Sequence, residues 1–430
     1  MKTMNTSRER ELLSAETRRR YAFFVLHNGW KQAFKSLPNF GILLLACAAA
    51  WLIMLHPLCI APPFLRPLLC CMGMILTVFA VIFGFYALGY VPGAWNAYDN
   101  FVRIGFVNAA GEAPLLVCRH ETGKSSQLTF RCKGLPPHDW TTRLEEIQSA
   151  LNLLIGRVQQ GDDLRTVIIT TVPPGTVWGK LLLWKEQYLP PGDAELVLGE
   201  TIAGDPVSVD LDLMPMLLVG GSTGSGKTRL CRLLIHQLLA HGAQVFVIDL
   251  KGLDFQPLKR RHVRVATRLD DVQEGLLDAV DTLYERLERL CNAECSNIRE
   301  YRNKTGQYIQ RMVILIDECA MLTDSGKTEK KQADVCIDAL KTLTRMGRAA
   351  GIHVIVCTQR PDSVAVPGSI KSNLDGRICG KADAILSTII LGDGRADERI
   401  PKDAQGRFIM SDGAADVVFQ AYWFDETNVN

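Results

Sequence analysis

The segment Gly220–Thr228, with the sequence GGSTGSGKT, has residue types and a spacing that suit phosphate binding. It stands between an apolar run, Met214–Val219, which predicts a buried strand, and Arg229–Ala240, which has helical periodicity. A glycine-rich turn between a strand and a helix, closed by Lys-Thr, is the P-loop pattern. Its glycines let backbone N–H groups turn toward phosphates, and the start of the helix adds the positive end of its dipole. The pattern predicts a nucleoside-triphosphate site.

Individual positions of this P-loop have predicted roles. The side chain of Lys227 would reach the β- and γ-phosphates, and the hydroxyl of Thr228 would bind Mg²⁺. ATP and Mg²⁺ are therefore the predicted cofactors. The residues predicted to bind the nucleotide are Gly221, Ser222, Thr223, Gly224, Ser225, Gly226, Lys227 and Thr228.

A second chemical motif, Asp317-Glu318, ends the apolar run Met312–Ile316. Because an interior strand of a parallel sheet cannot bury charge cheaply, two acids at its tip are expected to face the ligand crevice. Asp317 would hold Mg²⁺, and Glu318 would polarise the attacking water. The next apolar run leads to Gln359, whose amide could contact both the water and the γ-phosphate. Lys227, Glu318 and Gln359 are thus predicted catalytic residues.

Basic residues at the end of a predicted helix, Lys341, Arg345 and Arg348, leave two interpretations open. One of the arginines could reach the nucleotide of a neighbouring subunit, as arginine fingers do. Alternatively, these cations complement the negative C-terminal end of the helix.

Strand-like and helical patterns alternate from Leu196 onward. This alternation predicts an α/β fold with a mostly parallel sheet and helices on both faces. Ligands of such sheets bind at the carboxyl ends of the strands, where the chemical motifs fall. The predicted strands are Met216–Val219, Gln244–Asp249, Met312–Ile316, His353–Thr358 and Val417–Trp423, and the predicted helices are Arg229–Ala240, Asp270–Cys291 and Ala333–Ala350.

Residues 1–39 are polar and basic, whereas residues 40–91 are apolar with a single formal charge. Gly41–Leu55 with its flanks and Leu68–Val91 are each long enough to cross a membrane, and the prolines of His56–Pro67 separate them. The pattern predicts a transmembrane helical hairpin in the cell membrane. The basic lead predicts a cytoplasmic N-terminus, and a hairpin returns the P-loop region to the cytoplasm. The alternative is a pair of buried helices in a soluble domain.

Residues 92–195 are predicted to form a small α+β connecting domain without recognisable chemistry. Short strands are predicted over Pro114–Arg119, Gln127–Lys133 and Leu164–Val172, and a helix over Trp140–Gln159.

Composition adds little to the functional assignment. A formal net charge of +2 does not by itself indicate a nucleic-acid-binding protein. The 13 cysteines are scattered and match neither a disulfide framework nor a zinc spacing, and the eight histidines form no cluster. We expect free, mostly buried thiols and no structural metal.

Four segments resemble the FtsK/SpoIIIE family of membrane-tethered DNA-pumping ATPases, and they occur in the family's order. They are Met214–Thr228, Asn297–Tyr301, Gly347–Pro361 and Ile370–Asn373, and the likeness covers residues 195–425. The resemblance implies a RecA-like P-loop motor over residues 196–430. It further implies that the chain hydrolyses ATP as a homo-hexameric ring around DNA.

The resemblance also implies roles for single residues. Arg348, eleven residues before Gln359, matches the position from which related rings supply an arginine to the adjacent subunit, and Arg377 is a second candidate. Lys227 and Thr228 resemble the family's phosphate and Mg²⁺ residues, Asp317 and Glu318 its acidic pair, and Gln359 its sensor.

The chain differs from the large chromosome pumps, which have more membrane spans, a long linker and a winged-helix module. In its short form it resembles the FtsK-type coupling proteins of Gram-positive conjugative elements, which hand relaxase-bound DNA to a mating channel. The expected function is a membrane-anchored DNA translocase in conjugative transfer, with a relaxase and mating-channel proteins as partners. The alternatives are a chromosome-segregation translocase, a protein-secretion ATPase and a membrane scaffold that binds ATP without turnover.

Two basic groups are candidate DNA contacts. Cations in them would contact phosphates without reading sequence, and each group is equally interpretable as a solvated loop. The first is Asp324–Lys331 with Lys327, Lys330 and Lys331, which the family likeness places toward the pore of a ring, and the second is Lys259, Arg260, Arg261 and Arg264.

Overall fold

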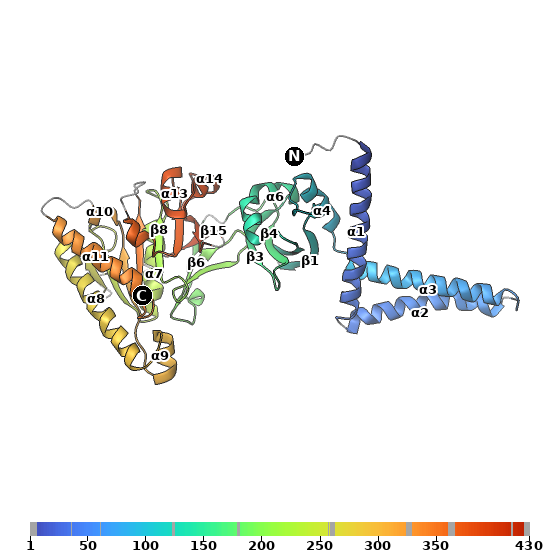
Figure 1. The fold of residues 1–430 in the computed structure, drawn as a ribbon, viewed down its shortest axis with the longest axis horizontal. Helices are drawn as coiled ribbons and strands as arrows, with labels where there is room; N and C mark the ends of the chain where they lie inside the picture. The colour runs from blue at the N-terminus through green and yellow to red at the C-terminus, as the bar shows by residue number, and fades with distance from the viewer. Residues whose placement is uncertain are drawn as a thin grey trace.

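The computed structural model describes residues 7–35, 37–60, 62–122, 125–178, 181–256, 258, 263–323, 329–359, 366–413 and 416–424. Figure 1 shows N-terminal helices, then a small sheet, then a large sheet covered by helices, in this order along the longest axis. The N-terminal helices are α1 (Ser7–Ala33), α2 (Leu37–Ile60) and α3 (Arg66–Gly89).

Helices α2 and α3 lie side by side as a hairpin, and α1 crosses the base of that hairpin (Figure 1). Among the described residues, α3 is the one helix long and apolar enough to cross a membrane, with a mean hydropathy of 2.6. A second candidate span exists only if Tyr21–Ala33 and Leu37–Ile53, bent by 112° from each other, are counted as one. Large apolar side chains on the hairpin are exposed, including Leu45, Leu52, Ile75, Phe79 and Phe83.

The break between the two apolar helices is shorter than the predicted His56–Pro67, because α2 continues to Ile60 and α3 begins at Arg66. Pro67 stands in the first turn of α3, where a helix does not use the backbone N–H that proline lacks. Pro67 therefore starts a helix instead of separating two.

Helices α1 and α3 approach each other at two glycines. A Cβ atom on Gly29 would lie 1.7 Å from the carbonyl oxygen of Phe85, and one on Gly89 would lie 1.9 Å from that of Val25. The side chain of Asn28 donates a hydrogen bond of 3.3 Å to the carbonyl of Gly89 at the same crossing. Only glycine permits this backbone contact, so Gly29 and Gly89 determine where the two helices cross.

The small sheet is antiparallel, with the strand order β1-β2-β4-β3. Its core contains packed aromatic rings, and the centroid of Trp140 lies 5.1 to 5.5 Å from those of Phe101, Phe106 and Phe130. Tyr21 and Val25 of α1 belong to this same core. The elements are α4 (Ala94–Arg103), β1 (Leu115–Thr122), β2 (Ser125–Arg131), α5 (Pro137–Thr142), α6 (Leu144–Leu151), β3 (Leu154–Gln160) and β4 (Thr166–Val172).

The helix predicted over Trp140–Gln159 is wrong in its second half. Helix α6 ends at Leu151 because Asn152 adopts the left-handed conformation, with φ of 52°. The following residues form β3, which pairs with β4 along its whole length. Pairing with the next strand, β4, thus determines the structure of residues that have a helical pattern.

The large sheet has eleven strands, and their order is β10-β9-β11-β12-β8-β13-β14-β15-β6-β7, with β5 beside β15. The strands from β10 to β13 in this order are parallel, and those from β13 to β7 pair antiparallel. The predicted parallel sheet is confirmed for the first group, whereas the antiparallel extension was not predicted. The strands are β5 (Leu182–Leu183), β6 (Glu195–Glu200), β7 (Pro206–Asp210), β8 (Met216–Gly220), β9 (Gln244–Ile248), β10 (Arg264–Ala266), β11 (Met312–Ile316), β12 (Ile352–Thr358), β13 (Gly376–Gly380), β14 (Arg407–Ser411) and β15 (Asp416–Trp423).

Helices cover both faces of the parallel strands, as predicted. Leu230 and Leu234 of α7 (Lys227–Ala240) belong to the core on one face, and α8 (Leu269–Asn292) and α11 (Lys330–Met346) supply apolar residues to the core on the other. Strands buried on both faces explain the continuous apolar runs in the sequence. The remaining helices are the 3₁₀ turn Glu186–Tyr188, α9 (Ile298–Thr305), α10 (Ala320–Thr323), α12 (Gly368–Lys371), α13 (Ala384–Leu391) and α14 (Arg395–Arg399).

Candidate nucleotide site

The predicted P-loop connects the end of β8 to the start of α7. Gly224 and Gly226 have φ of 77° and 100°, a region that favours glycine. Gly226 also borders a second chain segment, because a Cβ atom on it would lie 3.1 Å from Cα of Gly406. Gly224 is therefore required by the turn, and Gly226 both by the turn and by the close approach of the segment before β14.

The order of the strands brings the P-loop and the acidic pair together. Strand β12 lies between β8 and β11, so the P-loop, Gln359 and Asp317-Glu318 all meet at the carboxyl ends of three neighbouring parallel strands. The prediction that Gln359 follows the strand beside the acidic pair is confirmed.

Lys227 is only 3% exposed and contacts Asp317 directly. Its Nζ donates to the carbonyl oxygen of Asp317 at 3.0 Å and to Oδ1 at 3.1 Å. Burial acts to lower the pKa of Lys227, but the neighbouring Cys357, Asp317 and Cys231 side chains raise it, and the net pKa lies above that of an ordinary lysine. Lys227 is therefore a buried cation at the P-loop.

The site has two buried oxygens without a hydrogen-bond partner among the described residues: Oγ of Ser225, a residue that is 1% exposed, and Oδ2 of Asp317. Buried polar atoms normally have partners, so these two fit a site that is completed by a bound polar group. Oxygen ligands are what Mg²⁺ prefers. Thr228 is half-buried at the start of α7, and its metal role stays a prediction. No cluster of three or more possible metal ligands occurs within the described residues.

Glu318 is held by the end of strand β12. Its Oε1 accepts a hydrogen bond of 3.0 Å from Oγ1 of Thr358, and its Oε2 accepts one of 3.1 Å from the backbone N–H of Gln359. The side-chain oxygen of Gln359 in turn accepts from Oγ1 of Thr223 in the P-loop at 3.2 Å. These bonds link the acidic pair, Gln359 and the P-loop in one network. Thr358 was not among the predicted site residues, although it precedes Gln359 directly.

Asp249 is a further residue that sequence reasoning did not single out. It is buried at the end of β9, and its carboxylate accepts hydrogen bonds from the backbone N–H groups of Gly252, Asp254 and Phe255 at 3.0 to 3.1 Å. The loop held in this way carries Lys251, whose Nζ lies 3.8 Å from Oδ2 of Asp317. The signal for Asp249 was its place after an apolar strand, the same signal that identified Asp317.

Two thiols pack behind the P-loop. The sulfur atoms of Cys231 on α7 and Cys357 on β12 lie 3.4 Å apart, and both residues are fully buried. The contact with Cys231 and burial raise the pKa of the Cys357 thiol, and burial raises the pKa of Cys319 to about 12. All 13 cysteines are free, but only six of them are buried, so the prediction of mostly buried thiols is wrong.

Arg348 does not reach the P-loop of its own chain. It lies before the N-terminal end of β12, whereas the nucleotide site lies at the C-terminal ends of the strands. Its Nη2 donates to the carbonyl of Asp212 at 3.0 Å. Arg377 donates from β13 to the carbonyl of Ile390 at 2.9 Å. Donation of either arginine to another subunit stays a prediction.

A buried charged cluster lies beneath Arg348. Arg311 donates to Asp212 at 2.8 Å and contacts Nε2 of His353 at 3.0 Å. Burial and then Arg311 lower the pKa of His353 to about 3, and Nδ1 of this neutral ring faces the carbonyl of Pro215 at 3.2 Å. Arg311 directly precedes β11, so this cluster and the acidic pair stand at opposite ends of one strand.

In the second predicted basic group, Arg264 has carboxylate partners within its own chain. Its guanidinium is paired with Glu274 at 3.0 Å and Asp278 at 2.6 Å, and it lies over the ring of Phe246. Lys330 and Lys331 are exposed at the start of α11. Asp324, Lys327, Lys259, Arg260 and Arg261 lie outside the described residues.

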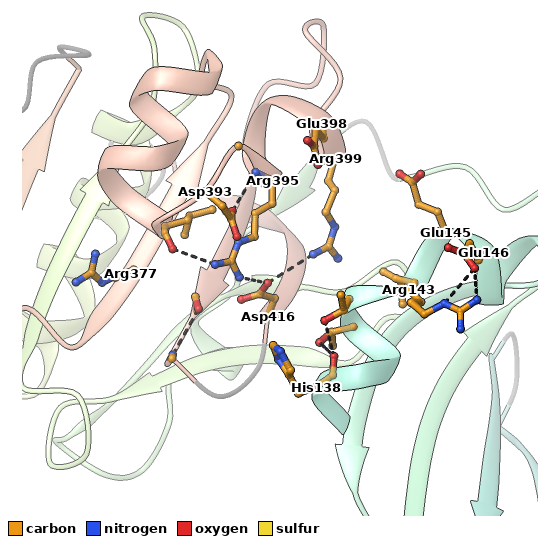
Figure 2. A pocket seen from close by; sticks show the side chains of 17 residues that line it. His138, Arg143, Glu145, Glu146, Arg377, Asp393, Arg395, Glu398, Arg399 and Asp416 are labelled. Atoms are coloured by element: carbon orange, nitrogen blue, oxygen red, sulfur yellow. Dashed lines mark hydrogen bonds and ion pairs between the residues drawn. The ribbon is translucent and has the colours of Figure 1, made fainter. Parts of the chain in front are cut away.

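A cavity of about 740 Å³ separates the small sheet domain from the large sheet, and none of the predicted P-loop residues lines it. Figure 2 shows Arg395 between Asp393 and Asp416, with Arg399 also pointing to Asp416, at 3.7 Å. Across the cavity, Arg143 pairs with Glu146. Several charges in this cavity are paired with one another, and it contains neither the P-loop nor the acidic pair.

Comparisons with known proteins agree with this geometry. The family model described as FtsK/SpoIIIE matches residues 183–363. A solved structure of the pCW3 conjugation coupling protein TcpA with ATPγS is 31% identical, with a TM-score of 0.57, and the match covers 78% of this chain and 96% of that one.

Two curated relatives are DNA translocases. The protein named DNA translocase FtsK from Staphylococcus epidermidis is 30% identical over 231 residues, which are 48% of this chain and 28% of the relative. Its namesake from Leptospira interrogans is 30% identical over 258 residues, 56% of this chain and 26% of the relative. The matched part thus spans about a quarter of these relatives' length.

Proposed function

The chain belongs to the FtsK/SpoIIIE family of P-loop ATPases, and from this premise we propose that it is an ATP-driven DNA translocase that acts as a membrane-anchored coupling protein in conjugative DNA transfer. The observation that carries the proposal is the network at the carboxyl ends of β8, β11 and β12, where Lys227, Asp317, Glu318 and Gln359 meet. The match to TcpA, named a conjugation coupling protein, supports the finer assignment.

Each residue of this network has a defined task in hydrolysis. Lys227 exchanges its two bonds to Asp317 for phosphate oxygens and keeps its positive charge. Glu318, held by Thr358 and the backbone of Gln359, orients and deprotonates the attacking water. Thr228 and Asp317 would hold Mg²⁺, which neutralises charge on the phosphates.

Attachment to the membrane is supported by the exposed apolar surface of α2 and α3. Soluble proteins rarely expose contiguous apolar surface of this extent, and α3 has the length and hydropathy of a membrane span. A hairpin in the membrane would hold the ATPase at the entrance of a mating channel.

The DNA-stimulated ATPase rate of the full-length chain in lipid nanodiscs tests the function. Single- or double-stranded DNA should raise the rate, Lys227→Ala should abolish it, and Glu318→Gln should retain bound ATP without turnover. Lys304→Ala is the matched control, because Lys304 is an exposed lysine that pairs with Glu294 on the motor surface. An ATPase rate that neither form of DNA changes would contradict the translocase proposal.

A further inference from the structure

A small cavity lies where α1 packs on the four-stranded sheet, far along the chain from the nucleotide site. We propose that it binds the phosphate headgroup of an anionic phospholipid. The proposal rests on the membrane attachment in the proposed function. The cavity has a volume of about 260 Å³, and its lining includes Tyr21 and Phe24 of α1, Tyr98 of α4, Glu112, Arg131 and Lys133.

The lining carries the charge that a phosphodiester requires. Arg131 is half-buried and Lys133 is exposed, and together they place two cations at the cavity against one carboxylate, Glu112. The net excess of one positive charge matches a singly charged phosphodiester. A guanidinium binds phosphate oxygens through two parallel hydrogen bonds, which favours Arg131 as the main contact.

A buried hydroxyl at the cavity lacks a partner. Tyr21 is 8% exposed, its ring packs edge-on against Trp95 at 5.4 Å, and its hydroxyl has no hydrogen-bond partner among the described residues. Buried hydroxyls are nearly always paired, so an unpaired one that lines a cavity indicates a missing acceptor. A phosphate or ester oxygen of a lipid is such an acceptor.

The geometry of the helices places the cavity at the level of lipid headgroups. The Tyr21–Ala33 part of α1 is bent by 112° from α2 and crosses the base of the hairpin (Figure 1), so α1 lies along the membrane surface when the hairpin is inserted. Trp30, Tyr86 and Tyr90 are exposed near this crossing, and Tyr and Trp are enriched where a membrane meets water. Phe24 and the tyrosines supply an apolar wall beside the cations.

The binding experiment uses the full-length chain, freed of lipid in detergent, and short-chain phosphatidylglycerol as the probe. Saturable binding is expected, with phosphatidylcholine about tenfold weaker and no competition by millimolar inorganic phosphate. Equal binding of the two lipids would overturn the proposal. Competition by inorganic phosphate would identify a free-phosphate site instead of a lipid site, and would also overturn it.

Variants assign the binding to this cavity. Arg131→Ala and the exposed Lys133→Ala should each weaken phosphatidylglycerol binding about tenfold, because each removes a charge-assisted contact. Arg119→Ala removes a cation of the same sheet that is paired with Glu121 and does not line the cavity, and it should bind as the unaltered chain does. Unchanged binding by both cavity variants would contradict the assignment.

Tyr21→Phe separates a structural from a binding role. The substitution removes only the unpaired hydroxyl, so the melting temperature without lipid should stay equal or rise, while the stabilisation by phosphatidylglycerol should fall. An undiminished stabilisation would show that the hydroxyl does not face the lipid. DNA-stimulated ATP hydrolysis is measured on the same preparation, so failure of the translocase function and failure of lipid binding are read independently.

Discussion

Glu318 owes its position to two hydrogen bonds from the end of β12, and one of the donors is the hydroxyl of Thr358. Thr358→Val keeps the shape of the side chain and removes this donor. We expect ATP hydrolysis to fall about tenfold with ATP binding unchanged, because a misplaced base costs about 1.4 kcal/mol in the transition state. Steady-state hydrolysis and nucleotide affinity measure the two effects.

Thr344→Val is the matched control for this prediction. Thr344 is also buried, but its hydroxyl donates to carbonyl oxygens within α11 and accepts a long bond of 3.4 Å from Nδ2 of Asn373, and it has no bond to the acidic pair. It should leave the hydrolysis rate nearly unchanged. Equal rates for the Thr358 variant and the unaltered chain would mean that Gln359 alone positions Glu318.

His353 predicts a pH dependence of stability. Burial and Arg311 lower its pKa to about 3 in the folded chain, whereas an unfolded histidine has a pKa of about 6.5. Between these values the unfolded state binds more protons, so stability falls as pH decreases below about 6.5, by up to about 1.4 kcal/mol per pH unit. His353→Gln, which stays neutral, should show a flatter dependence of melting temperature on pH between 7.5 and 5.

The exposed His120 provides the control for this measurement. His120→Gln should keep the full slope of melting temperature against pH. If His353→Gln also keeps that slope, another group is responsible for the acid sensitivity of the motor.

At the scale of elements, the sequence predicted the parallel part of the large sheet but, in its antiparallel part, only the strand Val417–Trp423, which is β15. Runs such as Met312–Ile316 are buried on both faces and are therefore continuously apolar, which makes them visible without any partner strand. Strand β13 (Gly376–Gly380) contains two glycines and an arginine, and its strand conformation depends on pairing with β8 and β14. Such a segment lacks the run of apolar residues from which a strand could be predicted.

The residues of the candidate site also divide into those that the sequence predicts and those that it does not. The P-loop, Asp317, Glu318 and Gln359 were predictable because each follows an apolar strand that ends at one edge of the sheet. Thr358 could not be assigned, because its role comes from the neighbouring strand that carries Glu318. Sequence patterns report the environment along a strand better than the contacts between strands.

The close contact between α1 and α3 predicts which glycine substitutions will disturb the packing of these helices. Gly29→Ala would place a methyl group 1.7 Å from the carbonyl oxygen of Phe85, so the helices must separate. We expect a loss of about 1–3 kcal/mol in the stability of this packing and faster proteolysis between α1 and α2. Gly41→Ala, with no atom within 4 Å of the added carbon, should be neutral or slightly stabilising, because alanine favours helices. Similar proteolysis of both variants would contradict the close contact.

At the scale of the whole assembly, the opposite placement of Lys227 and Arg348 predicts complementation between inactive variants. If the chain forms a ring in which Arg348 serves the next subunit, Lys227→Ala and Arg348→Ala should each abolish hydrolysis, but rings assembled from a 1:1 mixture of the two variants would restore about one active interface in four. In these interfaces an intact Lys227 faces an intact Arg348 of the next subunit. ATPase rates of the mixed and separate variants give the measurement, and an inactive mixture of properly assembled rings would exclude donation between subunits.

Strand β11 runs from the end of the sheet near Arg348 to the end that carries the nucleotide site. Six residue steps separate Arg311 in the buried charged cluster from Asp317 at the nucleotide, a distance of about 20 Å at the rise of a strand. The strand is hydrogen-bonded to β9 on one side and β12 on the other. Asp317 is thus joined through one paired strand to the cluster of Arg311 and Asp212, which also holds Arg348.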